Sequence, residues 1–285
     1  MKKFWKSLVC AVLSVAMVFA LAACGGGYEA KAVKIVDAEL EQFGIAVQKD
    51  VSTNDTLLNM INTVIDEWSV DESDGSTKME KLVNYYNSVY WDEEVEAPFT
   101  LHLEGKSGAT AKIVMATEPG FAPFEFLGEN NQIVGLDVAL MGEVAYRLNS
   151  KLEIKEMAFS SLTATAFSQA DVIAAGMTIT SERQAAMDFS KPYFESTQYI
   201  ICAEDADYNE VKDLAGLAIG VQEGTTGDYL ISDAIDLEDG DLYNSGSTVK
   251  RYENAPVAFE DLKKGTIKAI VIDELPAKAL VERSK

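Results

Sequence analysis

Histidine and cysteine are scarce in this chain of 285 residues, which has one histidine and three cysteines. A Ser/His/Asp or Cys/His arrangement needs a histidine beside its nucleophile, and structural zinc sites are made of Cys and His ligands. The one histidine, His102, lies away from any predicted strand end. Gly224–Gly227 (GTTG) lacks the lysine of a phosphate-binding loop. The sequence therefore predicts no catalytic residues, no metal site and no cofactor.

Positive charge is also in short supply. The chain has 24 Lys and Arg against 46 Asp and Glu, for a formal charge of −22. Such an acidic surface argues against binding to nucleic acid and against adsorption to anionic lipid. An apolar content of 48% with 25% charged residues is ordinary for a folded protein, and 285 residues can bury one large core or two small ones.

The N-terminal residues predict export and a lipid anchor. Residues 1–6 are basic, residues 7–23 are apolar, and the sequence LAACG around Cys24 resembles the lipobox of bacterial lipoproteins. An ordinary cleaved signal peptide or an uncleaved membrane anchor would share the apolar segment. The small residues before Cys24 favour a lipoprotein signal peptide at residues 1–23, lipidation of Cys24 and a flexible tether at residues 24–32. Such an anchor would hold the protein on the outer face of the cell membrane.

Strands alternate with helices from residue 111 to the C-terminus, which predicts parallel sheets. The chain is expected to form one lobe from residues 111–193 and a second from residues 194–285. The predicted strands are 112–117, 151–157, a run from 171, 198–203, 217–222, 248–252 and 267–272. The predicted helices are 136–148, 161–168, 208–214, 227–234, 256–264 and 276–283.

Residues 176–194, GMTITSERQAAMDFSKPYF, concentrate groups suited to an anion. Thr178 and Thr180 bring hydroxyls, Thr180 is a candidate N-cap, and Arg183 falls in the first turn of a short helix. A helix start offers free backbone N–H groups, so a guanidinium and hydroxyls beside it make a receptor for a carboxylate. A capped helix whose arginine pairs with a neighbouring aspartate is the alternative.

The motif GMTIT-x-ER followed by MDFSKPYFES resembles the signature of the amino-acid-binding proteins of ABC importers (solute-binding protein family 3, type II periplasmic-binding fold). The resemblance runs from about Ala111 to the C-terminus. It implies a two-lobed α/β protein, with parallel-rich sheets in each lobe, that closes over one free amino acid and delivers it to ABC permease subunits as a monomer. A few enzymes of this fold, such as dehydratases of cyclic carboxylates, and a non-transporting receptor lipoprotein are the alternatives.

Residues 33–91 resemble the C-terminal tail of the same family. They contain, in order, strand patterns at 33–37 and 44–48, an amphipathic helix at 54–68, an acidic turn, and a second helix that starts at the capping box Thr77–Glu80. In the family this tail follows the strand that ends in a ligand-binding aspartate, whereas here that strand lies near the end of the chain.

We therefore expect a circular permutant. Residues 33–44 would supply a displaced strand of lobe 2, residues 45–91 would supply displaced helices of lobe 1, and residues 92–110 would link the former ends. A separate appendage, or completion of a second copy by domain swapping, would be the alternatives.

Polar residues follow several predicted strands, and ligands of open α/β sheets bind beyond the carboxyl ends of the strands. Charge and the family resemblance give these residues roles. In lobe 1, Arg183 and Thr178, with the backbone N–H groups at Ala175–Thr178 (Gly176 included), would take the α-carboxylate of the ligand. From lobe 2, Thr225 and Thr226 would reach the same carboxylate and Asp273 would pair with the α-ammonium. Helix or strand caps are the alternatives for these second-lobe residues.

The pocket for the ligand side chain is less defined by the sequence. Phe121 and Phe159 match positions where the family places aromatic residues around the ligand, although either could belong to the core. Glu118 would suit a polar or cationic side chain by charge pairing, or could be a surface residue. Gln222 lies where selectivity varies in the family. Lysine, arginine, histidine and glutamine all remain open as ligands.

Overall fold

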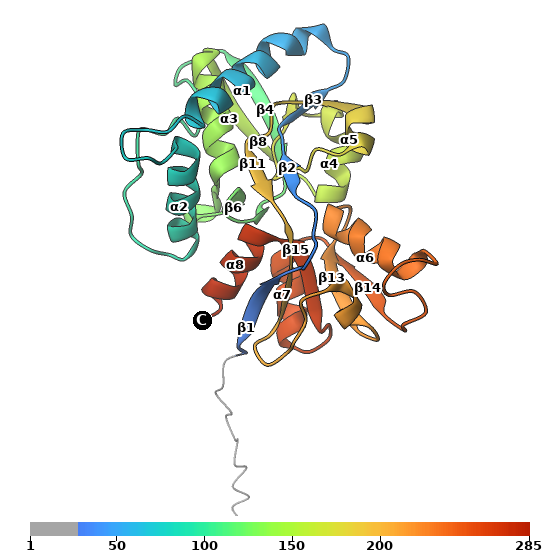
Figure 1. The fold of residues 1–285 in the computed structure, drawn as a ribbon. Coiled ribbons are helices and arrows are strands. Elements are labelled where there is room, and N and C mark those ends of the chain that lie inside the picture. The colour runs from blue at the N-terminus through green and yellow to red at the C-terminus, as the bar shows by residue number, and fades with distance from the viewer. Residues whose placement is uncertain (1–27) are drawn as a thin grey trace, which may run out of the picture.

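The computed structural model describes residues 28–285, which form two α/β lobes placed one above the other (Figure 1). The predicted signal peptide and residues 24–27 of the predicted tether, which include Cys24, lie outside the described residues. Each lobe is built on a five-stranded sheet, and the chain crosses between the lobes twice.

The central sheet of lobe 1 combines two distant parts of the chain. Its order is β10-β3-β9-β4-β8, in which β9, β4 and β8 pair in parallel while β3 pairs antiparallel with both β10 and β9. The bounds are β3 Ala46–Gln48, β4 Ala111–Thr117, β8 Ser150–Glu156, β9 Val172–Ile173 and β10 Met187–Phe189. Because β3 lies between β10 and β9, the N-terminal segment is an interior part of this sheet.

Helices and a small sheet cover lobe 1. The helices are α1 Asp55–Trp68, α2 Lys78–Tyr90, α3 Leu136–Arg147, α4 Phe159–Thr165 and α5 Ser181–Ala186, with 3-10 turns at Ser52–Asn54, Glu129–Asn131 and Ala166–Ser168. The small sheet consists of β5 Gly120–Phe121, β6 Glu125–Leu127 and β7 Ile133–Val134. The capping box predicted at Thr77 and Glu80 is confirmed, and it starts α2.

Helix α1 packs on α3 through the apolar face that its periodicity predicts. The residues buried on that face are Leu57, Ile61, Val64, Ile65 and Trp68. They join one hydrophobic core with residues of α2, α3 and the lobe 1 sheet. Residues 45–91 are therefore part of lobe 1, and they are not a separate appendage.

Lobe 2 has a mixed sheet in the order β1-β12-β15-β13-β14. The bounds are β1 Ala30–Lys34, β12 Gln198–Ala203, β13 Ala218–Gln222, β14 Thr248–Tyr252 and β15 Ala269–Asp273. Helices α6 Thr226–Asp236, α7 Ala255–Lys263 and α8 Glu274–Arg283 and the 3-10 turn Val211–Leu214 pack around this sheet. The N-terminal segment contributes β1, which pairs antiparallel with β12 along the edge.

Two short strands form the connection between the lobes. Strand β2, Glu41–Phe43, pairs antiparallel with β11, Phe194–Ser196. The two strands run side by side between the lobes in Figure 1. Each crossover segment therefore supports the other at the hinge.

The predicted two-lobed α/β fold is confirmed, and three details differ. Parallel pairing holds for three strands of each sheet, because β3 in lobe 1 and β12 in lobe 2 run antiparallel to the strands on both sides of them. The strand predicted at 33–37 is β1, Ala30–Lys34, and it ends before the turn at Asp37, whose φ is 63°. The helix predicted at 208–214 is only the 3-10 turn Val211–Leu214.

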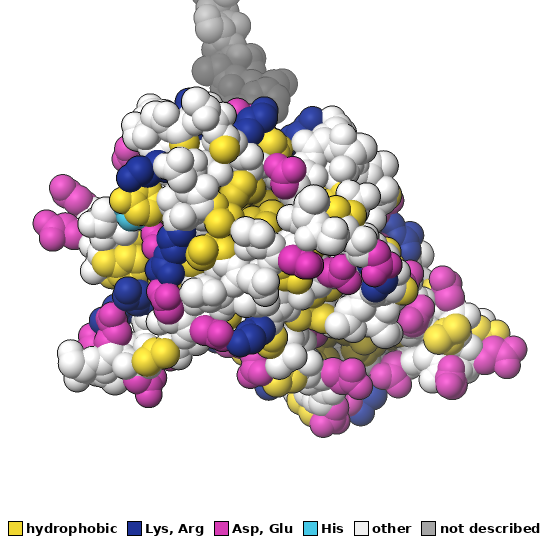
Figure 2. Space-filling view, turned by 90° about the horizontal axis from the view of Figure 1, so that it is seen from above, with side chains coloured by type: hydrophobic (Ala, Val, Ile, Leu, Met, Phe, Trp, Pro, Cys, Tyr) yellow, Lys and Arg dark blue, Asp and Glu magenta, His cyan; other side chains and the backbone are white. Residues whose placement is uncertain are grey.

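The surface of the described residues follows the acidic composition. Figure 2 shows Asp and Glu side chains spread over one face, with Lys, Arg and hydrophobic side chains interspersed among them. Within residues 28–285, no helix is long and apolar enough to cross a membrane. His102 stacks on Tyr146 with ring centroids 3.6 Å apart and bonds to Glu143, which gives it a structural role in residues 92–110.

Candidate functional site

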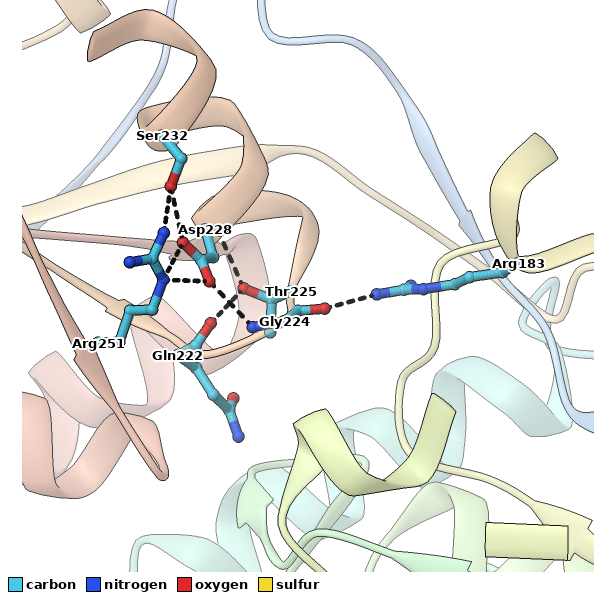
Figure 3. Close-up of polar contacts among 7 residues, drawn as sticks. All are labelled: Arg183, Gln222, Gly224, Thr225, Asp228, Ser232 and Arg251. Carbon is cyan, nitrogen blue, oxygen red and sulfur yellow. Dashed lines mark hydrogen bonds and ion pairs between the residues drawn. The ribbon is translucent and has the colours of Figure 1, made fainter. Parts of the chain in front are cut away.

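Arg183 lies at the boundary between the lobes and is buried. Thr180 caps α5, as predicted, because its hydroxyl accepts from the backbone N–H of Arg183 at 3.1 Å. The Arg183 Nη1 donates to the carbonyl of Thr178 at 2.9 Å, and Nη2 donates across the cleft to the carbonyl of Gly224 at 3.1 Å (Figure 3). The guanidinium lies 5.4 Å from the ring centroid of Phe159. Burial lowers the pKa of Arg183, and Tyr229, Glu41 and Asp273 oppose this shift.

An ion pair between Asp228 and Arg251 supports the loop at Gly224 in lobe 2. Asp228 accepts from the N–H of Gly224 at 3.0 Å and from Nε of Arg251 at 2.9 Å, and Arg251 also reaches Ser232 (Figure 3). This network fixes the loop that faces Arg183.

The Thr225 hydroxyl caps α6 and is bonded to the end of β13. It accepts from the N–H of Asp228 at 3.2 Å and donates to the carbonyl of Gln222 at 2.8 Å. These are the hydrogen bonds of the helix-cap alternative. The hydroxyl of the neighbouring Thr226 donates instead to the carboxylate of Glu41.

A tight turn at Gly176 follows β9. Gly176 has φ +50°, and a Cβ at this position would lie 2.4 Å from a ring carbon of Phe121, so a side chain does not fit. The Gly176 N–H donates to Asp137 at 3.0 Å, and Asp137 also accepts from the Tyr193 hydroxyl at 2.7 Å. Among the backbone N–H groups expected at the ligand, that of Gly176 is therefore already taken by Asp137. Ala175 is buried beside this turn.

A second carboxyl group lies beside Asp137. Both carboxyl oxygens of Glu125 are buried and have no hydrogen-bond partner among the described residues. Burial, followed by the charge of Asp137, raises the pKa of Glu125 well above its ordinary value, and burial raises the pKa of Asp137 to about 6. A protonated Glu125 next to a charged Asp137 fits this environment, in which two charges would repel each other.

Asp273 ends β15, as predicted for a strand-end residue. It is 5% exposed, and its Oδ1 has no hydrogen-bond partner among the described residues. Burial, followed by the charge of Glu41, raises the pKa of Asp273 to about 7. Gln198 is its partner in the register of β12 and β15, and the Gln198 amide donates to Glu41. A buried carboxylate with a free oxygen is an acceptor for a cation.

Glu118 and Gln222 meet across the lobes. The amide Nε2 of Gln222 donates to Oε2 of Glu118 at 2.7 Å and to the carbonyl of Glu253 at 3.1 Å. Both side chains are buried, so the surface alternative for Glu118 is wrong. Burial raises the pKa of Glu118 to about 7, against the effect of the hydrogen bond from Gln222.

The two candidate aromatic residues have different surroundings. Phe121 packs on Phe43 and Phe124, with ring centroids 6.1 and 5.6 Å apart, and belongs to the main hydrophobic core. Phe159 starts α4 and packs under the Arg183 guanidinium. Phe121 therefore contributes to the core as well as to the turn at Gly176.

The sequence patterns missed the polar residues that support the site. Glu41 and Gln198 contact Thr226, and Asp137 holds the Gly176 turn. Glu41 lies in a three-residue strand without a clear pattern, and Asp137 lies in the first turn of α3, where an acidic residue is common for reasons of the helix dipole. Within residues 28–285 there is no cluster of three His, Cys, Asp or Glu side chains that could hold a metal.

Comparison with known proteins identifies the class. The sequence profile of "Bacterial extracellular solute-binding proteins, family 3" matches residues 113–272, so the chain belongs to this family. The match covers lobe 1 from residue 113 and lobe 2 as far as residue 272, so it includes Glu118, Arg183 and Gln222 but leaves out β1, Asp273 and α8.

Individual relatives agree with this assignment. The chain is 35% identical over 161 residues to the "Probable histidine-binding protein" of Neisseria gonorrhoeae, covering 56% of this chain and 58% of the relative. It is 33% identical to "ABC transporter arginine-binding protein 1" of Escherichia coli K12, covering 59% of this chain and 65% of the relative. The chain thus spans less than two thirds of these two curated relatives.

A solved structure extends the comparison to three dimensions. The arginine-bound form of truncated ArgBP from T. maritima superimposes with a TM-score of 0.55 at 38% identity. The overlap covers 61% of this chain and 78% of the ArgBP chain. All three of these relatives are binding proteins, and the fold of ArgBP matches the two-lobed fold of this chain.

Proposed function

We propose that this protein binds a free amino acid with a cationic side chain outside the cytoplasm and delivers it to an ABC permease. The observation that carries the proposal is the pair formed by Arg183 and Asp273. Both are buried at the junction of the lobes, they have opposite charge, and within residues 28–285 neither takes part in an ion pair. A zwitterion would supply the missing partner for each, and a buried charge without a partner costs about 3–5 kcal/mol.

Glu118 is the feature that favours a cationic side chain. Its carboxyl group is buried, its only side-chain partner among the described residues is the Gln222 amide, and Phe121 lies three residues further on. A guanidinium or imidazolium could pair with the Glu118 carboxylate. The names of the arginine- and histidine-binding relatives support the same choice of ligand.

The expected localisation follows from the N-terminal sequence. Lipidation at Cys24 would tether the protein to the outer face of the membrane, beside the permease that it serves. The extracellular family supports this location.

Circular permutation is part of the proposal. Strand β3 and helices α1 and α2 complete lobe 1, and β1 completes the edge of the lobe 2 sheet. Ala30, near the start of the described residues, and Lys285 line the same cavity of about 900 Å³, so a short connection could join the two ends. We expect residues 92–110 to be the connection that replaced the original termini.

Thermal melting with each of the twenty amino acids tests the proposed function. Arginine at 100 times its Kd should stabilise the protein by about 2.7 kcal/mol, which corresponds to a rise in Tm of roughly 5–10 °C. Histidine and lysine should raise Tm less, and acidic or apolar amino acids should not raise it. Absence of any rise, together with turnover of a cyclic carboxylate, would favour the enzyme alternative. Binding without an uptake defect in a deletion strain would favour the receptor alternative.

Glu118→Gln is expected to weaken arginine binding and to remove part of its pH dependence. The pKa of Glu118 is about 7, so the ligand-free carboxyl group is protonated at pH 5 and charged at pH 8. Binding a cation requires the charged form, so the affinity of the wild type should rise with pH up to about tenfold per unit below pH 7. Asp273, whose pKa is also about 7, adds to this dependence.

Calorimetric titration at pH 5, 6, 7 and 8 measures this effect. The Glu118→Gln variant should bind arginine at least about tenfold more weakly at pH 8 and should show a flatter pH profile. Glu153→Gln is the matched control, because Glu153 is an exposed carboxylate on the neighbouring strand β8. Equal affinities of the Glu118→Gln variant and the wild type at pH 8 would contradict the role of Glu118.

A further inference from the structure

The Glu41 carboxylate contacts both lobes. Its Oε2 accepts from the Thr178 hydroxyl of lobe 1 at 2.6 Å and from the Thr226 hydroxyl of lobe 2 at 2.7 Å. Its Oε1 accepts from Nε2 of Gln198 at 2.9 Å. One side chain from the hinge strand β2 thus holds a hydroxyl from each side of the cleft.

These hydrogen bonds fix what the two hydroxyls can do for a ligand. A threonine hydroxyl has one proton and two acceptor lone pairs. Because both protons are directed to Glu41, Thr178 can only accept from a further group. Thr226 already accepts from Gln198 at 3.3 Å. This arrangement suits an ammonium group, which donates, and does not suit a carboxylate, which accepts.

Asp273 provides a second, independent observation at the same place. Its Oδ1 is buried and has no hydrogen-bond partner among the described residues, and the charge of Glu41 acts on it. A cation near Thr178 could therefore meet two carboxylates, one from the hinge and one from the end of β15. Glu41 itself is half-buried and borders a cavity of about 850 Å³, so its charge keeps contact with solvent.

We propose that Glu41 is a positioning residue that ties Thr178 of lobe 1 to Thr226 of lobe 2 and thereby couples closure of the lobes to recognition of the α-ammonium group. The part concerning the ammonium rests on the proposed function, whereas the tie between the lobes does not. The role expected for Thr178 at the ligand carboxylate is then reassigned to the ammonium. Arg183 remains the partner of the carboxylate.

The matched pair of variants for this proposal is Glu41→Gln and Glu195→Gln. Glu195 is a carboxylate on the opposite hinge strand, directly paired with Gln42 in the β2–β11 register. It is exposed and accepts from the Gln42 amide, without contact to either threonine. Both substitutions remove one negative charge from the strands that connect the lobes. Only Glu41→Gln removes a charge that accepts hydrogen bonds from both lobes.

The first measurement needs no ligand. Spin labels at Gln184 on α5 and Asp233 on α6, both exposed, report the distance between the lobes by pulsed electron paramagnetic resonance. Glu41→Gln should lengthen or broaden the distance distribution, and Glu195→Gln should leave it as in the wild type. An unchanged distribution in Glu41→Gln overturns the tie between the lobes.

The second measurement compares arginine with 5-guanidinopentanoate, which lacks the α-ammonium group. Glu41→Gln should weaken arginine binding by about tenfold or more and should weaken binding of the analogue far less. An equal loss for both compounds would mean a merely structural role and overturns the coupling to the ammonium. If the wild type binds no amino acid, the proposed function fails, and the distance measurement still decides whether Glu41 ties the lobes.

Discussion

Arg183→Ala is expected to weaken binding of the amino acid by at least about 100-fold. Arg183 is 6% exposed, and its two terminal nitrogens donate to Thr178 in lobe 1 and to Gly224 in lobe 2. Alanine would remove the partner of the ligand carboxylate and the hydrogen bond between the lobes together. A carboxylate that enters the cleft would then be desolvated without a counter-charge, and this cost appears directly in the Kd.

Titration calorimetry of folded variants measures this loss. Arg147→Ala is the control, because Arg147 also lies in lobe 1 but pairs with Glu67 and Glu143 on the helices. Arg183→Lys should recover only part of the affinity, since an ammonium cannot reproduce the two-pronged geometry of a guanidinium. Unchanged affinity in a folded Arg183→Ala variant would exclude this residue as the carboxylate partner.

Moving residues 28–91 to follow Lys285 is expected to give a folded protein that binds the same ligand. In such a chain Asp92 would be the first residue, and a short Gly/Ser connection would join Lys285 to residue 28. Exposed chain ends that lie close together tolerate this rearrangement. The expected Tm lies within a few degrees of the Tm of the natural order, measured by circular dichroism.

Deleting residues 28–91 instead should abolish folding. The deletion removes β3 from the middle of the lobe 1 sheet and removes Ile61, Val64 and Leu82, all fully buried, from the core. The loss exceeds the roughly 5–15 kcal/mol that stabilises a typical domain. A cooperative melting transition of the truncated chain would contradict the assignment of this segment to both lobes. Light scattering of the intact chain separates completion within one molecule from domain swapping, which would give a dimer.

Several parts of the fold could be predicted because each had a local physical signal. The helix at Asp55–Trp68 has a clear apolar face, α2 starts at a capping box, and β12 and β14 have the predicted bounds. By contrast, β2 and β11 are three residues long, and they are defined by pairing with each other. No periodicity within so short a segment can reveal a partner about 150 residues away.

Some residues of the candidate site could likewise be predicted from local signals, and others could not. Three of its residues lie at helix starts or strand ends that the sequence predicts, and their positions could therefore be predicted: Arg183, Thr180 and Asp273. The bonds of Glu41 to two threonines and of Asp137 to Gly176 join segments far apart in the sequence. The hydrogen bonds of the Thr225 hydroxyl and of the Gly176 N–H could not be predicted for the same reason, since a residue type does not reveal which neighbour already occupies its hydrogen bonds.

The interior position of β3 has a consequence for the order of events during synthesis. The apolar faces of α1 and α2 leave the ribosome before α3, on which both helices pack. Strand β3 leaves it more than 120 residues before β9 and β10, with which it pairs. The lobe 1 sheet is incomplete until β10, which ends at Phe189, has been synthesised. Strand β1 likewise has no pairing partner until β12 has been synthesised. A nascent chain with such late contacts stays unfolded for longer, so the proposed export would begin before lobe 1 is complete.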